Sequence, residues 1–290
     1  MATRPTLPYF APAELLPAPL PTVAEIQAGT RISSRYQTPV YRVGDHFAVK
    51  FGGRTSLQEG ENMLFVKQST GIHIPQVYAI FHDEATELDY IVMDYVPGRN
   101  LKDAWGTLDA TEQRAIALQL RKHMDELRSI PSPGYYGGIW RQPIRDFNFL
   151  DQLEQPHTEP NIAGPHETEE QWVEAMYHVL VKMLVSVQEG DLEHFRRHYH
   201  VVLKGHKPVF THANLIPINI ILQNDGTAVI IDWENAGWYP SFWEYCCTTM
   251  QLRVSNDWGD LIYDILDMYA PELGWVSHHR DMVRFGCSAP

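Results

Sequence analysis

The sequence predicts an α+β protein with a small, sheet-rich N-terminal part and a larger, mostly helical C-terminal part. Three observations support this prediction. Short β-type runs flank one helical segment in roughly the first hundred residues. Helical spacing of apolar residues dominates beyond Pro97-Gly98, where we place a domain boundary. A second, shorter β-rich patch interrupts the helices over residues 208–234.

The N-terminal part is expected to be a small sheet with one helix packed on it. Residues 1–21 contain six prolines and should form an irregular arm ahead of this sheet. Thr22 and Gly29 suit the start and the end of a short helix, and the pair Gly44-Asp45 suits a turn between strands. The expected helices span 22–29 and 56–70, and the expected strands span 32–43, 46–52, 75–82 and 88–96.

The C-terminal part, residues 98–290, is expected to contain helices around one β-hairpin. The turn Asn224-Asp225-Gly226 joins the two hairpin strands. A polar stretch over residues 152–167 is interpreted as a surface insertion. The expected segments are helices over 110–129 and 168–187, strands over 208–215, 218–223 and 227–234, and further helices after Pro240.

Composition excludes several classes of protein. The formal net charge is −13, and no dense run of Lys and Arg provides the basic face that a nucleic-acid binder needs. The cysteines Cys246, Cys247 and Cys287 lack metal-ligand spacing and a convenient disulfide pairing, which indicates a reducing compartment. No apolar run approaches the roughly 18 residues of a membrane span, and no signal pattern begins the chain. We therefore expect a soluble, cytoplasmic protein without a nucleic-acid or membrane partner; no feature predicts its oligomeric state.

The strongest chemical signal is the stretch FTHANLIPINIILQNDGTAVIIDWE. It places His212, Asn214 and Asn219 on a loop between strands and Asp232 at the end of the next strand. Four residues separate Asn214 from Asn219, which is the spacing of the kinase catalytic loop H-x-D-x-x-x-x-N. Asn219 and Asp232 flank one hairpin and are placed to converge on Mg²⁺, which prefers oxygen ligands. The alternative is an ordinary hairpin with a polar start, but the upstream strand with Lys50 favours a site.

Ordered motifs along the chain carry a family resemblance. They read FAVKFG, LQEGENMLFV, YIVMDYVPGRNL, FTHANLIPINIIL and IDWENAGWYPSFWEY. Together they resemble the aminoglycoside phosphotransferase and choline-kinase-like family, especially its fungal branch, over residues 30–250. The resemblance implies a two-lobed protein-kinase-like fold, with a small β-rich N-lobe and a larger, mostly helical C-lobe. It also implies ATP and Mg²⁺ as cofactors and a small-molecule acceptor whose hydroxyl is phosphorylated.

The resemblance assigns roles to residues of the expected nucleotide-binding part, residues 22–97. Lys50 corresponds to the lysine that grips the α- and β-phosphates, although it could be an edge-strand residue with its head in water. Glu59 corresponds to the helical glutamate that forms an ion pair with this lysine, and Glu61 is the alternative. Either residue could instead lie on a solvated face of the helix without a functional role. The backbone of the hinge, which comprises Met93, Asp94, Tyr95 and Val96, would contact adenine.

In the C-terminal part the resemblance identifies Asp232 as the metal-binding aspartate and Asn219 as its companion ligand. His212 and Asn214 fall in the catalytic loop. The residues of the pattern that follows are interpreted mainly as packing; they are Trp238, Tyr239, Trp243 and Glu244.

Asn214 departs from the family, which has its catalytic aspartate at this position. A neutral amide cannot accept the proton of the acceptor hydroxyl, so the resemblance predicts a weakened kinase. Either the aspartate was deliberately replaced, or asparagine is natural and the fold has drifted from phosphorylation. Ile218 in place of a basic residue, Ala213 in place of glycine, and a glycine-free nucleotide-covering segment over 33–39 favour drift.

Three hypotheses follow: an ATP- and Mg²⁺-dependent O-phosphotransferase, a descendant that converts or binds a metabolite without phosphoryl transfer, and a regulatory pseudokinase. A cationic acceptor would suit acidic side chains in the helical part, although a solvated acidic face explains them equally; these are Asp146, Asp151, Glu154, Glu170 and Glu174. An apolar ligand would suit a set of aromatic residues, for which packing is the alternative; these are Tyr135, Tyr136, Trp140, Phe147 and Phe149.

Overall fold

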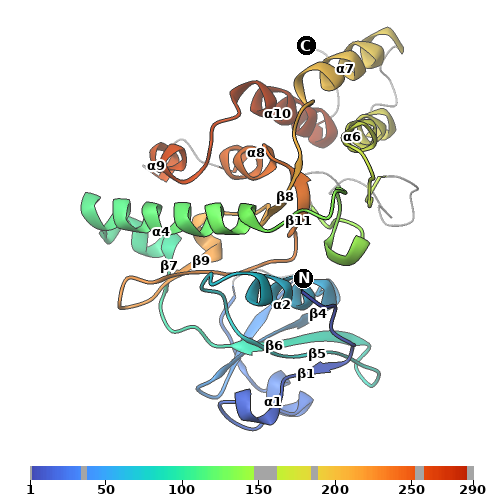
Figure 1. Cartoon of the computed structure of the whole chain (residues 1–290). Helices are drawn as coiled ribbons and strands as arrows, with labels where there is room; N and C mark the ends of the chain where they lie inside the picture. The colour runs from blue at the N-terminus through green and yellow to red at the C-terminus, as the bar shows by residue number, and fades with distance from the viewer. Residues whose placement is uncertain (1, 34–37, 147–161, 184–188, 252–257, 286–290) are drawn as a thin grey trace. The chain divides into compact units, whose positions relative to one another are not determined.

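The structure is a computed structural model that describes residues 2–33, 38–146, 162–183, 189–251 and 258–285 (Figure 1). It divides into two compact units. The sheet unit comprises Met1–Leu108 and Pro217–Glu234, and the helical unit comprises Asp109–Ile216 and Asn235–Pro290. The sheet unit extends past Pro97-Gly98, where the sequence placed a boundary, and takes in the predicted hairpin. The α+β class is confirmed.

A six-stranded antiparallel sheet forms the centre of the sheet unit, in the order β1-β5-β6-β4-β3-β2. Its strands are β1 (Tyr9–Phe10), β2 (Thr30–Arg31), β3 (Val40–Val43), β4 (Phe47–Gly52), β5 (Val77–Asp83) and β6 (Leu88–Asp94). The four longer strands confirm the predicted ones, although β3 is much shorter than the predicted 32–43. The two outer strands have two residues each, which is too short for the alternating pattern that reveals a strand in sequence.

Two helices accompany this sheet, and each has an N-cap residue at its predicted start. The helix α1 (Val23–Gln27) begins with a capping box in which Thr22 and Glu25 bond each other's backbone N–H. The helix α2 (Leu57–Ser69) begins at Ser56, whose hydroxyl accepts the N–H of Gln58. Figure 1 shows α2 lying along the sheet, where it contacts β5 and β6. Residues from Gln58 to Val66 are all buried, so α2 has no solvated face along this stretch.

The N-terminal arm has more regular structure than the sequence predicts. Its strand β1 pairs with β5 at the edge of the sheet, and the short 3₁₀ helix η1 (Ala13–Leu15) follows. Arg4 forms an ion pair with Glu61 of α2, with Nε 2.9 Å from the carboxylate oxygen. The prolines Pro8 and Pro12 flank β1 without interrupting it, which is the position that an edge strand tolerates.

The predicted hairpin is present in the sheet unit. It consists of β9 (Ile220–Leu222) and β10 (Ala228–Ile230), with Ile220 opposite Ile230. A strand that the sequence did not predict, β7 (Arg99–Asn100), pairs with the other edge of β9. It leads into α3 (Leu101–Ala104) and η2 (Trp105–Thr107), while η4 (Pro217–Asn219) precedes β9.

Gly98 permits the pairing of β7 with β9, and its replacement tests how tightly these strands approach. A Cβ atom on Gly98 would lie 2.5 Å from the backbone oxygen of Leu222. Gly98→Ala is therefore expected to lower the free energy of unfolding by about 1–3 kcal/mol, the usual cost of overpacking. Gly53→Ala is the matched control, because nothing lies within 4 Å of its added Cβ. Equal denaturant midpoints for the two variants would contradict the close approach.

The helical unit packs its helices around buried aromatic rings. Trp172 makes edge-to-face contacts with Tyr239 and Trp243 at 5.4 Å between ring centroids, and Trp238 is also buried, so the packing interpretation of these rings is confirmed. The elements are α4 (Ala110–Ser129), η3 (Ile139–Arg141), α6 (Glu169–Met183), α7 (Glu189–Val202), β8 (Pro208–Thr211), β11 (Gly237–Pro240), α8 (Trp243–Met250), α9 (Trp258–Ile265) and α10 (Ala270–Phe285).

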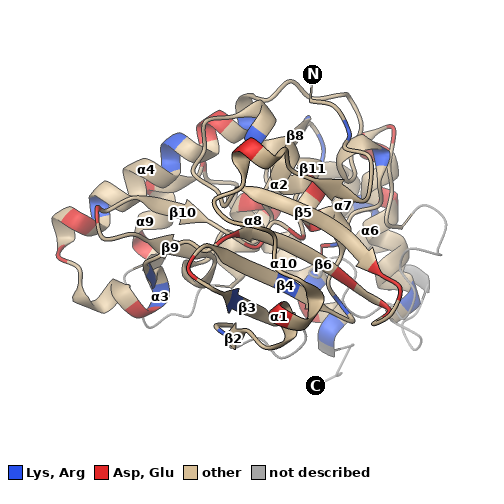
Figure 2. Ribbon diagram, turned by 90° about the horizontal axis from the view of Figure 1, so that it is seen from below, with Lys and Arg blue, Asp and Glu red and all other residues tan. Residues whose placement is uncertain are grey.

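The helix α4 has the predicted bounds, and α6 confirms the predicted helix 168–187 as far as Met183. Figure 2 shows Lys and Arg interspersed with Asp and Glu along α4. Among the described helices, none is long and apolar enough to cross a membrane. Several residues singled out from the sequence lie outside the described residues: 34–37 of the covering segment, 152–161 of the polar stretch, 184–187 of the predicted helix, Phe147, Phe149, Asp151, Glu154 and Cys287.

Candidate active site

Lys50 is buried at the centre of the sheet, with 3% of its side chain exposed. It lies on β4, where it pairs with Val40 of β3 on one side and Ile91 of β6 on the other. Since β4 is an inner strand, the reading of Lys50 as an edge residue with its head in water is wrong. Its ammonium group must therefore find its partners inside the protein.

Three carboxylates surround that ammonium group. The Nζ atom of Lys50 lies 2.6 Å from Glu59, 2.8 Å from Asp232 and 3.4 Å from Glu234. Burial alone would lower the pKa of Lys50, but the charges of Asp232, Glu59 and Glu234 outweigh it and raise the pKa. Burial also raises the pKa of the Glu59 carboxyl, and the charge of Lys50 opposes this shift.

The carboxylates of the cluster lie close to one another. Oxygens of Glu59, Asp232 and Glu234 lie within 4.8 Å of one another, and Lys50 forms an ion pair with all three. Carboxylates gathered in this way provide a set of oxygen donors for a divalent cation. Hard oxygen donors of this kind suit Mg²⁺.

Glu59 and Glu61 have separate partners on α2. Glu59 contacts Lys50, whereas Glu61 contacts Arg4 of the arm. Two residues apart on a helix, their side chains point to nearly opposite faces. Both side chains are almost fully buried, so the solvated-face reading is wrong for each. The geometry therefore gives Glu59, and not Glu61, the position beside Lys50.

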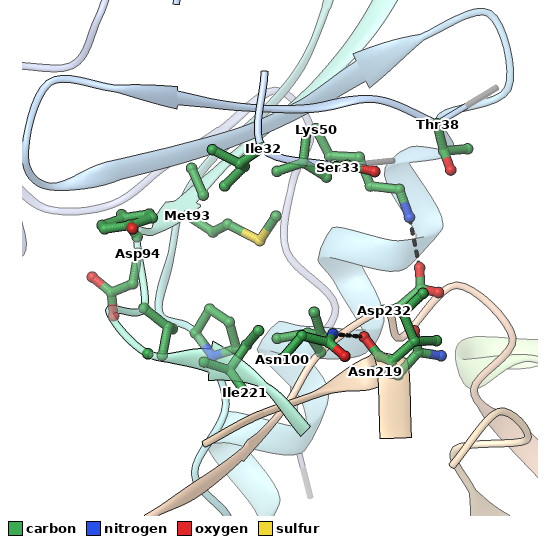
Figure 3. Close-up of a pocket in the computed structure, with 18 of the residues that line it drawn as sticks. Ile32, Ser33, Thr38, Lys50, Met93, Asp94, Asn100, Asn219, Ile221 and Asp232 are labelled. Atoms are coloured by element: carbon green, nitrogen blue, oxygen red, sulfur yellow. Dashed lines mark hydrogen bonds and ion pairs between the residues drawn. The ribbon is translucent and has the colours of Figure 1, made fainter. Parts of the chain in front are cut away.

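Asn219 and Asp232 lie at the open end of the hairpin, where Asn219 directly precedes β9 and Asp232 follows β10. The backbone N–H of Ile231 donates to the carbonyl oxygen of Asn219 at 2.9 Å, which holds the two segments side by side. Asp232 adopts φ +69°, a left-handed conformation that is uncommon for residues other than glycine. Figure 3 shows its carboxylate pointing toward Lys50, with Asn219 next to it. Strained backbone at such a point is typical of functional sites.

The hinge residues Asp94 and Tyr95 form hydrogen bonds with residues at the start of β5 and just before β4. The carboxylate of Asp94 accepts the N–H of Gln76 at 3.0 Å and the hydroxyl of Tyr78. The N–H of Tyr95 donates to the carbonyl of His46 at 2.8 Å. The backbone N–H of Val96 has no hydrogen-bond partner in the part of the chain that the structure describes. A donor of this kind is available to a ligand.

One cavity of about 560 Å³ brings these groups together within the sheet unit. Its volume is in the range of small-molecule and cofactor sites. Figure 3 shows Met93 pointing into it. The sequence-predicted residues that line it are Lys50, Glu59, Met93, Asp94, Val96, Asn219 and Asp232.

His212 and Asn214 lie in the helical unit, on a buried loop after β8. The carboxylate of Glu244 on α8 accepts the N–H of His212 at 2.7 Å and that of Ala213 at 3.2 Å. The N–H of Asn214 donates to Nδ1 of His212, and the side-chain oxygen of Asn214 accepts Nε2–H of Gln251 at 3.2 Å. Ala213 adopts φ +62°, which explains why the family usually has glycine there.

Glu244 makes stability depend on pH. Burial raises the pKa of its carboxyl to about 7, against the N–H groups of Ala213 and His212, which lower it. In the unfolded chain this carboxyl has an ordinary pKa near 4.5. Between these two values the folded state holds a proton that the unfolded state has released. This contribution to the free energy of unfolding is therefore lost as the pH rises toward 7.

Glu244→Gln is expected to remove that dependence, since its amide oxygen still accepts from the loop and carries no charge. Between pH 5 and pH 8 the wild type should lose roughly 2–3 kcal/mol more stability than the variant does. Urea denaturation of both proteins at the two pH values measures this. Parallel pH profiles for the two proteins would show that Glu244 is not the titrating group.

Sequence reasoning missed several residues that the structure places at or around these sites. Glu234 carried a signal, because it stands two positions after Asp232 and can face the same side of an extended chain. Glu244 was interpreted as a packing residue. Its carboxylate accepts backbone N–H groups of the loop after β8, and this role could not be predicted because Glu244 and the loop are at least 31 positions apart in the sequence. Asn100 and Gln251 showed no pattern at all, since their partners are distant in sequence.

Other candidates have structural partners. Asp146 is fully buried and accepts the indole N–H of Trp243 at 2.6 Å, whereas Glu170 is exposed. Glu174 pairs with Arg196 and His200. Among the aromatic set, Tyr135 and Tyr136 are buried and donate their hydroxyls to the carbonyl groups of Gly138 and His206. Packing therefore explains these two rings.

Solved structures share this fold at low sequence identity. The complex of APH(2")-IIa with streptomycin and ATP is 16% identical, with a TM-score of 0.57, over 91% of this chain and 88% of that one. ADP-bound aminoglycoside phosphotransferase APH(2'')-Ib is 16% identical, with a TM-score of 0.58, over 93% of each chain. APH(4)-Ia is 14% identical, with a TM-score of 0.51, over 87% of this chain and 83% of that one. Such matches establish the fold: kinase-like, with an N-terminal antiparallel sheet and a helical C-terminal region.

The family follows from the sequence itself. The profile of the phosphotransferase enzyme family (APH) matches residues 28–279. The chain therefore belongs to the phosphotransferase enzyme family. A comparison with curated proteins gives no match.

Proposed function

We propose that this protein is an ATP- and Mg²⁺-dependent phosphotransferase that acts on a hydroxyl group of a small molecule, with its chemistry weakened by Asn214. One observation carries the proposal. The cavity of the sheet unit combines the buried Lys50, the carboxylates of Glu59 and Asp232, the amide of Asn219 and the N–H of Val96. A third carboxylate, that of Glu234, lies 3.4 Å from the same lysine. These are the groups that a nucleoside triphosphate with its metal requires.

Each group has a role that its chemistry supports. Val96 N–H would donate to the adenine ring, and the ammonium of Lys50 would donate to phosphate oxygens in strong, charge-assisted hydrogen bonds. Glu59 would hold Lys50 in place through their 2.6 Å ion pair. Asp232 and Asn219 provide oxygen ligands that fit Mg²⁺. When bound, Mg²⁺ neutralises charge on the phosphates.

Asn214 limits the reaction to what positioning alone achieves. Its amide cannot take the proton of the acceptor hydroxyl, and a positioned base typically contributes ~10²–10⁴-fold. Much of phosphoryl transfer depends on orientation and charge stabilisation, which the cavity residues would still provide. We therefore propose a slow kinase whose nucleotide site remains functional.

A repurposed cleft or a regulatory pseudokinase is the second candidate, and the contact of Asn214 with Gln251 favours it. The two side chains form an amide pair, with Gln251 donating to the Asn214 oxygen at 3.2 Å. The Asn214 side chain therefore has a hydrogen-bond partner of its own in the helical unit. This reading expects a native conversion without ADP formation, or nucleotide binding without turnover.

The acceptor is proposed to be a hydroxylated small molecule in the cytoplasm. Structural neighbours were solved with streptomycin, gentamicin and kanamycin, which are aminoglycosides. The net charge of −13 is compatible with a cationic acceptor.

A thermal-shift series tests the proposed function. A ligand that binds only the folded state must raise its apparent stability. ATP with MgCl₂ at about 100 times the dissociation constant should raise the melting temperature by roughly 3–6 °C. ATP with EDTA should give a smaller shift. No shift with millimolar ATP in either condition would reject the nucleotide site and favour the repurposed cleft.

A further inference from the structure

Asn100 is a polar residue of the cavity wall that the proposed mechanism does not use. Its side-chain Nδ2 donates to the carbonyl oxygen of Ile218, and its Oδ1 accepts the backbone N–H of Lys102 at 3.0 Å. A donor and an acceptor are thus engaged at opposite ends of the amide. Because a flipped amide would lose both bonds, the orientation of Asn100 is fixed.

The backbone around Asn100 is equally constrained. It belongs to β7, where Asn100 lies opposite Ile221 of β9. The close approach at Gly98 brings β7 within contact of β9, and Leu101 anchors α3 with no exposed surface. The segment that leaves the hinge after Val96 is therefore bound to the strand that begins directly after Asn219.

The bond to Ile218 acts on the metal ligand next to it. The carbonyl of Ile218 belongs to the peptide group that joins Ile218 to Asn219. Because a peptide group is planar, the hydrogen bond to this oxygen also fixes the orientation of the backbone N–H of Asn219. On the other side, the carbonyl of Asn219 accepts the N–H of Ile231 at 2.9 Å. The Asn219 backbone is thus held from both sides. Figure 3 shows Asn100 and Asn219 side by side, and a dashed line marks the hydrogen bond that Asn100 donates to the carbonyl oxygen of Ile218.

We infer that Asn100 is a positioning residue that holds Asn219 ready to bind the metal and couples the adenine end of the cavity to the metal end. The inference rests on the proposed nucleotide and metal site. The coupling has a thermodynamic consequence: nucleotide binding at the hinge and Mg²⁺ binding at Asn219 should each strengthen the other, by the same factor. Loss of the Asn100 bond should weaken Mg²⁺ binding more than binding of the nucleotide alone.

The alternative role for Asn100 is that of a helix cap only, and one substitution separates the two roles. Asn100→Ser retains a good N-cap for α3, but serine is too short to reach the carbonyl of Ile218. Asp109→Ala is the matched control, since it removes a cap with two backbone bonds from α4 and leaves the cavity intact. It reports the effect of a general loss of helix stability.

The experiment is calorimetric titration of ADP into each protein over a series of MgCl₂ concentrations and in EDTA. For Asn100→Ser the Mg²⁺ concentration that gives half of the full affinity should rise about 3- to 10-fold, and ADP affinity in EDTA should change less than about 2-fold. Hydrogen exchange of peptides covering residues 217–222 should accelerate in the same variant. Asp109→Ala should change neither the Mg²⁺ requirement nor this exchange.

An unchanged Mg²⁺ requirement in Asn100→Ser, or equal losses with and without Mg²⁺, would overturn the positioning role while the wild type still binds nucleotide. Failure of the wild type to bind ADP at any Mg²⁺ concentration would instead overturn the proposed function, and this inference with it. The two failures are thus distinguished by the wild-type titration.

Discussion

Lys50→Met is expected to weaken binding of ATP with Mg²⁺ by roughly 10²–10⁴-fold. Hydrogen bonds to charged groups contribute about 1.5–3 kcal/mol each, and a lysine that contacts two phosphates makes at least two of them. Methionine has a similar length and no charge. It leaves the volume of β4 nearly unchanged while removing the cation that lies 2.8 Å from Asp232. Calorimetry on the two proteins measures the loss.

The same variant should also be less stable, in a pH-dependent way. Removing one partner of a buried ion pair costs about 3–5 kcal/mol, because the other charge stays buried. Without Lys50, the pKa of the Glu59 carboxyl rises further above that of the unfolded chain, because the charge of Lys50 no longer opposes the effect of burial. The stability loss is therefore smaller at pH 5, where the Glu59 carboxyl can bind a proton, and larger at pH 8.

Lys67→Met is the control for Lys50→Met, since Lys67 is exposed near the end of α2. It should bind ATP like the wild type and unfold at the same denaturant concentration. If Lys50→Met bound nucleotide with wild-type affinity while remaining folded, Lys50 would not be the phosphate ligand, and the motif assignment would fail.

Asn214→Asp is expected to raise the rate of phosphoryl transfer, or of slow ATP hydrolysis, by roughly 10²–10⁴-fold. Aspartate is nearly isosteric with asparagine, and its carboxylate can still accept the hydrogen bond that Gln251 now donates to Asn214. This donor also lowers the cost of a new charge at a site that is only 2% exposed. ADP release is measured with and without a pool of cell-extract metabolites.

The control for this substitution makes the same change at an exposed position. Asn224 is exposed in the turn of the β9–β10 hairpin, and Asn224→Asp adds an equal charge at a residue that does not line the cavity of the sheet unit. It should leave ADP release at the wild-type rate. Loss of a native metabolite conversion in Asn214→Asp, with no ADP formed, would favour the repurposed cleft over the weakened kinase.

The sequence predicted those parts of the fold that have a local pattern. Strands β4, β5 and β6 alternate or run apolar over six or seven residues, and Thr22 and Ser56 cap their helices by contacts within a few positions. The two-residue strands β1, β2 and β7 lack such a pattern. They exist because a neighbouring strand offers an unpaired edge, which is a property of the folded sheet alone.

The candidate site was predictable to the extent that motifs carried it. Lys50, Asn219 and Asp232 came from ordered motifs, and the structure brings them into one cavity. Their surroundings depend on contacts between distant segments, such as that between Asn100 and Ile218, 118 positions apart. The burial of Lys50 likewise follows from the position of β4 inside the sheet, which no local pattern reveals.

Calorimetric titration of ATP into the wild-type protein, with and without Mg²⁺, tests the central claim most directly. The proposed site predicts binding of about one nucleotide per chain that strengthens with Mg²⁺. In Asp232→Ala this strengthening by Mg²⁺ should be lost, since Asp232 provides the carboxylate for the metal. Absence of any binding heat at millimolar ATP in both conditions, from a protein shown to be folded, would contradict it.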